Sequence, residues 1–173
     1  MIKYNNNSIN DWYFDTSDIV KVYRNNAVRY QKIYSGRAAT PKWIATYEGG
    51  VTSSAECDST SAITRNEITL TNLIDVVIGN CVTTIGNSAF SYCSSLTSLT
   101  IHDSVTSISN NAFRNCSSLT SITVNSTTPP TLSNSNIFIS TNDCPIYVPA
   151  ESVNAYKTAE NWSTYASRIQ AIQ

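Results

Sequence analysis

"CSSLTSLTIHDSVTSISNNAFRNCSSLTSITV", residues 93–124, contains nearly the same pattern twice. Shifting residues 82–101 by 23 lays them on residues 105–124, and thirteen of those twenty positions are identical. The shared positions carry Val, Ile, Ala, Phe, Cys and Leu on a background of Ser, Thr and Asn. A fixed period of this length is typical of a solenoid, in which each repeat is one coil that buries its apolar side chains against its neighbours.

The repeat also predicts the path of each coil. The segments "LTSLTI" and "LTSITV" predict short strands, and "NNAFRNC" predicts the turn that brings the chain back. Strands of successive coils would pair in parallel about 4.8 Å apart, so that equivalent side chains form ladders. The apolar residues expected to point inward in the second coil are Ile108, Phe113, Cys116, Leu119, Ile122 and Val124.

The pattern extends on both sides of the two full copies. Leu73, Val76 and Ile78 form a half-copy 23 residues before the first full strand segment. After residue 124 the period slips, because Pro129-Pro130 is inserted before Leu132 and Phe138, and "CPIYVP" predicts one more short strand.

One coil buries too little apolar surface to offset the cost of ordering its backbone, so both ends of a short stack need caps. At the C-terminal end, "VPAESVNAYKTAENW" predicts a short helix after Pro149 with Val153 and Tyr156 inward and Trp162 over the last coil. Tyr165 and Ile169 would supply a final turn.

The N-terminal part has a different pattern. "IVKVYRNNAVRYQKIY" alternates apolar and polar residues on both sides of Asn25-Asn26, which predicts a β-hairpin over residues 19–34. The predicted division is an N-terminal hairpin unit that anchors or caps (1–47), a linker (48–67), a solenoid (68–148) and a C-terminal helical cap (149–173). The predicted fold class is a solenoid with a short parallel β-sheet, 23-residue coils and little helix.

Charge and hydropathy narrow the function. The chain has 173 residues, is 41% hydrophobic and 13% charged, and has a net charge of −1, so nothing favours nucleic acid as a partner. No apolar run reaches the roughly 18 residues that a membrane span needs, and "MIKYNNNSINDWYFD" lacks the apolar core of a secretory signal. Residues 1–42 hold seven basic and three acidic residues, which fits either an acidic partner or a solvated hairpin face.

Residues capable of chemistry are few. The five cysteines include no CxxC pair and His102 is the only histidine, so no metal site, cofactor or catalytic residue is predicted. The cysteines are expected to be small buried hydrophobes. A Cys93–Cys116 disulfide is the alternative that strand spacing allows, and His102 is expected to be a surface residue.

Two groups of residues are candidates for binding. Alternation along the strands predicts a polar outer face that could bind sugar or polar peptide or could be only solvated, and it comprises Thr97, Ser98, Thr100, His102, Thr120, Ser121, Thr123 and Asn125. Trp12, Tyr13 and Phe14 are the predicted docking anchors of the N-terminal unit, because aromatic side chains dominate interface hot spots.

The motifs "VTTIGNSAFSYCSSLTSLTI" and "VTSISNNAFRNCSSLTSITV" resemble BspA-like leucine-rich repeats, which occur in surface proteins of bacteria of mucosal communities and in some protozoa. The resemblance covers residues 68–173, with about two full copies where relatives often have many, and it implies a leucine-rich-repeat solenoid. Separately, "MIKYNNNSINDWYFDTSDIVKVYRNNAVRYQKIY" is similar to N-terminal segments of virion proteins of Bacteroides-infecting phages.

These resemblances imply two alternative functions, both non-enzymatic. In the first, the chain belongs to the virion, as part of a tail, fibre or capsid decoration in a multi-copy assembly. Its N-terminal unit then docks to other virion proteins while the repeats face a host surface protein or glycan. In the second, the chain is an extracellular or cell-surface bacterial adhesin that binds host glycoproteins. The predicted absence of a signal peptide favours the first.

Overall fold

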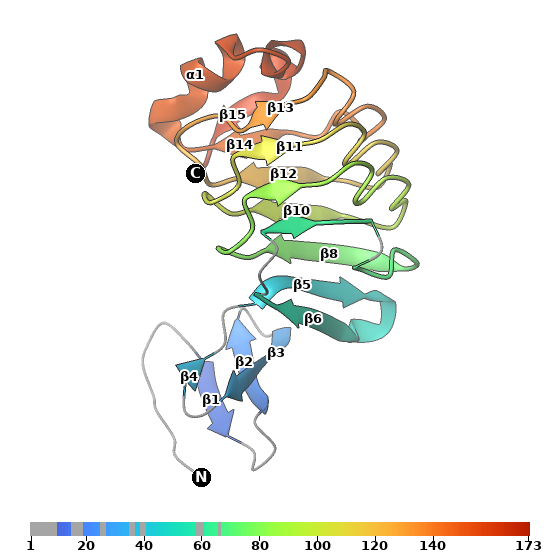
Figure 1. Cartoon of the computed structure of the whole chain (residues 1–173), viewed down its shortest axis with the longest axis vertical. Helices are drawn as coiled ribbons and strands as arrows, with labels where there is room; N and C mark the ends of the chain where they lie inside the picture. Colours follow the sequence, from blue (N-terminus) through green and yellow to red (C-terminus); the bar gives the residue numbers. More distant parts are fainter. Residues whose placement is uncertain are drawn as a thin grey trace.

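The structure is a computed structural model, and it describes residues 10–14, 19–24, 27–34, 37–38, 41–57, 61–65 and 67–173. Up to residue 38 only the backbone strands are described, and side chains are described from residue 41 onward. From residue 61 onward the chain winds into stacked coils (Figure 1).

One side of the stack is a seven-stranded sheet, called here the main sheet. Its order is β15-β14-β12-β10-β8-β5-β6. The strands are β5 (Pro41–Tyr47), β6 (Thr52–Glu56), β8 (Leu73–Ile78), β10 (Ser98–Ile101), β12 (Ser121–Val124), β14 (Ile146–Val148) and β15 (Ile169–Ala171). From β8 to β15 every pairing is parallel, and Leu99 lies between Val76 and Ile122.

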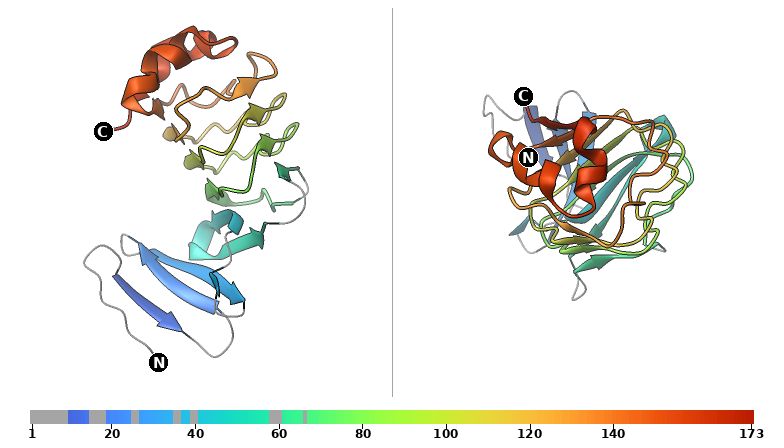
Figure 2. Two further views of the ribbon diagram at one scale, coloured as in Figure 1. Left: turned by 60° about the vertical axis from the view of Figure 1, so that its left-hand side comes forward. Right: turned by 90° about the horizontal axis from the view of Figure 1, so that it is seen from above.

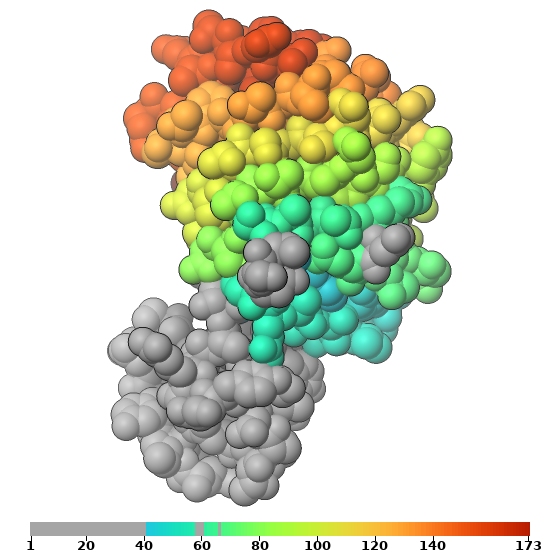
Figure 3. All heavy atoms as spheres, viewed as in Figure 1, coloured from blue at the N-terminus to red at the C-terminus, as the bar shows by residue number. Residues whose placement is uncertain are grey.

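The other side is a ladder of two-residue strands, called here the second sheet. It runs in the order β13-β11-β9-β7 and is built from β7 (Ala62–Ile63), β9 (Thr84–Ile85), β11 (Ser107–Ile108) and β13 (Thr131–Leu132). Figure 2 shows the stacked turns that join the two ladders, and Figure 3 shows the coils as successive bands of atoms. The prediction of a solenoid with parallel strands is confirmed, and it contains little helix.

The core is a set of ladders with one residue from each coil. All six residues predicted to point inward in the second coil are buried, with at most 1% of their surface exposed. Phe90 and Phe113 stack with ring centroids 5.2 Å apart, and Phe113 and Phe138 stack at 5.6 Å. The slip in period after residue 124 therefore leaves the phenylalanine ladder unbroken.

The turns rely on left-handed backbone at fixed positions. Ser88 and Asn111, one period apart, have φ of 53° and 55°, and Tyr92 and Asn115 have φ of 66° and 61°. Asparagine tolerates this conformation, whereas a residue with a bulky side chain is disfavoured by about 1–2 kcal/mol. Tyr92 is therefore unusual, since the repeat places asparagine at the same point one coil later.

The stack begins earlier than the half-copy predicts. Ile63 in β7 is buried and pairs with Ile85, and Ile68 is buried five residues further on, where the next coil has Phe90. Arg65 donates from Nη1 to the carbonyl oxygens of Ser88 (2.9 Å) and Ser91 (3.3 Å), which joins this first coil to the next.

Two antiparallel strands extend the main sheet before the first coil. β5 pairs with β8, so that Trp43 lies opposite Ile78, and β6 pairs with β5. The backbones come very close here, because a Cβ on Gly79 would lie 1.8 Å from the carbonyl oxygen of Pro41. β5 and β6 lie in the ranges that the sequence analysis assigned to the N-terminal unit and the linker.

A separate ladder of antiparallel strands lies nearer the N-terminus. It has the order β1-β2-β3-β4 and comprises β1 (Asn10–Phe14), β2 (Ile19–Arg24), β3 (Ala27–Tyr34) and β4 (Arg37–Ala38). Ile19 pairs with Lys32 and Arg24 with Ala27, within the range of the predicted hairpin. The predicted turn at residues 25–26 lies outside the described residues.

The C-terminal segment folds over the last coil. It contains the 3-10 helix η2 (Ala150–Ser152), helix α1 (Val153–Thr158), the 3-10 helix η3 (Trp162–Arg168) and β15. Trp162 is buried 5.7 Å from Phe138, centroid to centroid, and its Nε1 donates to the carbonyl oxygen of Pro130 (2.7 Å). Tyr156 is also buried, and its hydroxyl donates to the carbonyl oxygen of Ser126 (2.8 Å).

The Phe113→Ala variant should lose about 3–5 kcal/mol of unfolding free energy, because it removes the middle ring of the stack and leaves a cavity. Urea denaturation followed by circular dichroism measures the loss. The control is Ser117→Ala, which truncates an exposed side chain in the same coil and should change stability by less than about 0.5 kcal/mol. Equal stabilities of the two variants would contradict the ladder.

The stability of the fold depends on pH in the alkaline range because of Tyr156. Burial raises the pKa of its phenol, and the hydrogen bond to Ser126 only partly opposes the shift. The pKa of this phenol in the folded protein exceeds the unfolded value of about 10. The contribution of the protonated phenol to the free energy of unfolding is therefore complete below pH 10 and is lost as the pH rises above it.

The Tyr156→Phe variant should therefore be less stable by about 1 kcal/mol at pH 7 and should lose stability less steeply above pH 10 than the parent. Urea midpoints measured from pH 7 to pH 11 test this expectation. Tyr92→Phe changes an exposed phenol and is the matched control. If the Tyr156→Phe slope above pH 10 equals that of the parent, the phenol is not the group responsible.

Candidate functional site: the outer face of the main sheet

The outward side chains of the main sheet form two rows. Because paired residues project to the same side, the first row is Ile44, Val77, Thr100, Thr123, Tyr147 and Gln170. The second row is Thr46, Asp75, Ser98 and Ser121. None of these ten side chains is buried, so together they form one accessible surface, called here the outer face.

The eight polar residues predicted for a ligand face all lie on or beside this surface. Ser98, Thr100, Ser121 and Thr123 lie within β10 and β12 and are partly exposed. Thr97 and Thr120 come just before these strands and are exposed, and His102 and Asn125 follow them.

Some of these hydroxyl groups hold the coils together. The Oγ1 of Thr120 donates to the carbonyl oxygen of Thr97 (2.9 Å), and the Oγ1 of Thr97 donates to that of Ile74 (2.8 Å). The Oγ of Ser98 donates to the carboxylate of Asp75. The hydroxyls of Thr100, Ser121 and Thr123 remain available to a partner, because none of them makes a side-chain hydrogen bond among the described residues.

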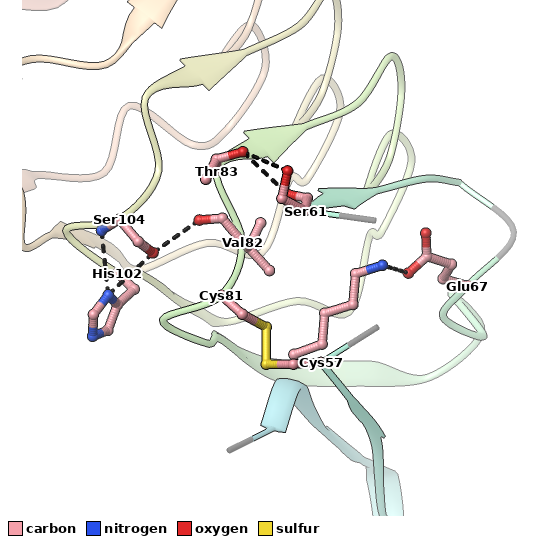
Figure 4. Close-up of a disulfide and its surroundings, with 9 residues drawn as sticks. Cys57, Ser61, Glu67, Cys81, Val82, Thr83, His102 and Ser104 are labelled. Atoms are coloured by element: carbon pink, nitrogen blue, oxygen red, sulfur yellow. Dashed lines mark hydrogen bonds and ion pairs between the residues drawn. A yellow bond between two sulfur atoms is a disulfide. The ribbon is translucent and has the colours of Figure 1, made fainter. Parts of the chain in front are cut away.

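His102 lies at the edge of the outer face with 38% of its side chain exposed. Its Nδ1 is 2.7 Å from the Oδ1 of Asp103 and 3.2 Å from the Oγ of Ser104, and that hydroxyl donates to the carbonyl oxygen of Val82. These contacts hold the loop after β10, and Figure 4 shows those among His102, Ser104 and Val82. A surface position was predicted for His102, and the side chain lies there.

The apolar members of the outer face were not predicted. Ile44 and Val77 pair across β5 and β8, and Tyr147 lies next to Thr123. Val77 lies 23 residues before Thr100, so the period marks it as outward-facing. Ile44 carries no such signal, because β5 lies before the repeat and joins the sheet in the opposite direction.

The outer face continues into a shallow hollow at the β5–β6 hairpin. The hollow has a volume of about 430 Å³ and is lined by Ile44 and residues 49–54. Val51, with 63% of its surface exposed, forms part of its wall. The outer face therefore has a hydroxyl-rich centre and an apolar end.

The expectation of five buried cysteines is wrong for two of them. Cys57 and Cys81 form a disulfide with Cα atoms 6.0 Å apart, which links the end of β6 to the loop after β8 (Figure 4). Neither is buried, since Cys57 is exposed and Cys81 is half-buried. Near the same end of the stack, Lys42 is buried and its Nζ lies 2.9 Å from the Oε2 of Glu67.

The other three cysteines are free and buried, as expected for small hydrophobes. The contact with Cys93, and then burial, raise the pKa of the Cys116 thiol, and burial raises that of Cys144. The Sγ of Cys116 donates to the carbonyl oxygen of Phe90 (3.1 Å). Cys116 and Cys144 are therefore protonated and buried, which makes them poor nucleophiles.

Two further features concern metal binding and membrane insertion in the part of the chain that the structure describes. No group of three or more His, Cys, Asp or Glu side chains there is placed to hold a metal ion. No helix in those same residues has the length and hydropathy needed to cross a membrane.

A family model for the BspA type leucine rich repeat region matches residues 60–159 in six copies, which is more than half of the 173 residues. The chain therefore belongs to the BspA-type leucine-rich-repeat family. Repeats of this class are typically non-enzymatic and mediate protein binding. No curated protein matches the sequence as a relative.

Loss of the Cys57–Cys81 disulfide should lower stability by about 3 kcal/mol, because the bond closes a loop across 24 residues of sequence. Cys57→Ser, Cys81→Ser and the double variant should be equally affected, since each lacks the bond. Urea denaturation with and without reductant measures the effect, and reductant should lower only the midpoint of the parent. A thiol assay in denaturant should count three thiols before reduction and five after it, whereas five before reduction would rule the bond out.

Proposed function

We propose that this chain is a non-enzymatic display module that binds a protein or glycan partner through the outer face of its main sheet. The supporting observation is the parallel register, which places Thr100 beside Thr123 and Val77 beside Thr100 on a rigid surface. Side chains at fixed strand spacing lose little conformational entropy when they bind an extended partner.

The disulfide supports a location outside the reducing cytoplasm. Disulfides persist in oxidising surroundings such as cell surfaces, secreted proteins and virions. Cys57–Cys81 also ties β6 to the first coils, so it protects the end of the stack nearest the N-terminus.

In this proposal both ends of the stack are capped. The segment 149–173 is the C-terminal cap, supported by the burial of Tyr156, Trp162 and Tyr165 against the last coil. β5 and β6 close the opposite end, where Trp43 and Ala45 join the core. The part of the N-terminal unit before β5, which contains β1 to β4, is then left to attach the module to a larger assembly.

The more specific form of the proposal is a virion component. Trp12, Tyr13 and Phe14, which lie in β1, would anchor the N-terminal unit to other virion proteins in a multi-copy assembly. Support comes from the similarity of residues 1–34 to phage virion proteins. The alternative is a cell-surface or secreted adhesin that binds host glycoproteins, which the repeat family favours. The disulfide fits either form.

Mass spectrometry of particles purified from the source culture, and of the washed cell surface from the same culture, separates the two forms. A virion component should copurify with particles at constant stoichiometry. The Trp12→Ala, Tyr13→Ala, Phe14→Ala triple variant should then be lost from particles while retaining its disulfide and its circular dichroism spectrum.

The same fractions contain the controls. Asn154→Arg, an exposed change in α1, should incorporate like the parent. Recovery only from the cell surface would favour the adhesin, and unchanged incorporation of the triple variant would refute the aromatic anchors.

A further inference from the structure

The turns of the solenoid form a second surface, distinct from the outer face of the main sheet. They appear as the stacked loops at the right of Figure 1, coloured from green to orange. Backbone hydrogen bonds hold successive turns in register, since the N–H of Tyr92 donates to the carbonyl oxygen of Arg114 (2.8 Å) and that of Asn115 to Ile139 (2.9 Å). Side chains on successive turns are therefore neighbours.

Tyr92 stands out on this surface. Its φ of 66° lies in the left-handed region, where Asn115 has 61° one period later. Bulky residues are disfavoured there, and such strain persists mainly at functional positions. The ring gains little from packing in return, because 65% of its surface is exposed.

The neighbours of Tyr92 complete a patch, called here the turn patch, which consists of Arg65, Tyr92, Arg114 and Ile139. Arg65 contacts the carbonyl oxygens of Ser88 and Ser91 from the coil before, and Arg114 and Ile139 follow in the next two coils. Arg114 is exposed, and its guanidinium has no ion pair or hydrogen bond among the described residues. Ile139 is 39% exposed.

The turn patch is positively charged, whereas the rest of residues 43–173 has a net negative charge. After residue 42 the sequence has four basic residues and nine acidic ones, and two of those four, Arg65 and Arg114, lie in the patch. A third, Arg168, lines a hollow of about 570 Å³ beside Ile139, and the exposed carboxylate of Asp143 lies 3.9 Å from its Nη1. Within residues 43–173, an acidic partner would therefore be attracted to this side and repelled by the rest of the stack.

We propose that the turn patch is a docking site for an acidic segment of a partner protein. Tyrosine and arginine are the residue types enriched in interface hot spots, and the arginine fork matches a carboxylate in two parallel hydrogen bonds. Tyr92 and Ile139 offer apolar area that suits peptide side chains better than a sulfated glycan. The site would operate independently of the outer face.

The test uses the full chain and a short fluorescent peptide that alternates pairs of Glu or Asp with Leu, followed by anisotropy at low and physiological salt. We expect saturable binding that weakens with salt. Tyr92→Asn, which installs the residue found at position 115, should weaken binding roughly tenfold or more. Because it relieves the backbone strain, this variant should be at least as stable to urea as the parent.

Charge-matched variants separate docking from general attraction. Arg114→Glu should weaken binding at least as much as Tyr92→Asn, whereas Lys157→Glu, the same charge change at an exposed position on α1, should have little effect. A peptide with Ser in place of Leu should bind more weakly than the parent peptide, which tests the apolar contribution.

Several results would overturn the proposal. These are unchanged affinity of Tyr92→Asn, equal effects of Arg114→Glu and Lys157→Glu, and binding of a heparin fragment in preference to the acidic peptide. Self-association in sedimentation that Arg114→Glu abolishes would instead assign the patch to a second copy of the chain. Loss of stability in Tyr92→Asn would show that the tyrosine serves the fold.

Discussion

The structure depends on one constraint, the in-register parallel pairing of coils that are about 23 residues long. With Leu99 fixed between Val76 and Ile122, every equivalent side chain lies on the same rung. The phenylalanines then stack on one another, and the threonine hydroxyls reach the carbonyl oxygens of the preceding coil. A slip of one residue would turn the buried set outward, so the core and both surfaces follow from the same register.

A stack of coils in this register could be extended without limit unless its ends are covered. The two ends of this stack are covered in different ways. Before the first coil, β5 joins the sheet in the antiparallel direction, and only glycine at position 79 allows the backbones to approach. The disulfide fixes that junction covalently. After the last coil, aromatic side chains cover the end of the stack. Trp162 and Tyr165 pack on Phe138, the third phenylalanine of the ladder.

Sequence reasoning succeeded where residues recur and failed where the repeat is degenerate. The strands β10 and β12 and their buried residues were predictable because thirteen of twenty positions recur. The coil at Ile63 was missed because Ile68 stands where later coils have phenylalanine. The Cys57–Cys81 bond was missed because the period was applied only to the repeat, although a separation of 24 is close to one coil. On the candidate site, outward positions were predictable within the repeat, but the contribution of Ile44 depends on a strand pairing that no local pattern indicates.

Comparing equivalent positions in successive coils shows which differences the fold explains and which it does not. Inward positions tolerate only side chains that fill the rung, so their conservation from coil to coil reflects packing alone. Outward and turn positions are free of that demand, and asparagine or threonine satisfies the backbone there at least cost. A tyrosine at position 92, in a conformation that asparagine adopts at position 115, is not explained by the fold. Tyr147, beside Thr123 on the outer face, departs from the pattern without backbone strain. Tyr92 is the more informative of the two tyrosines, because the fold alone would favour asparagine at its position.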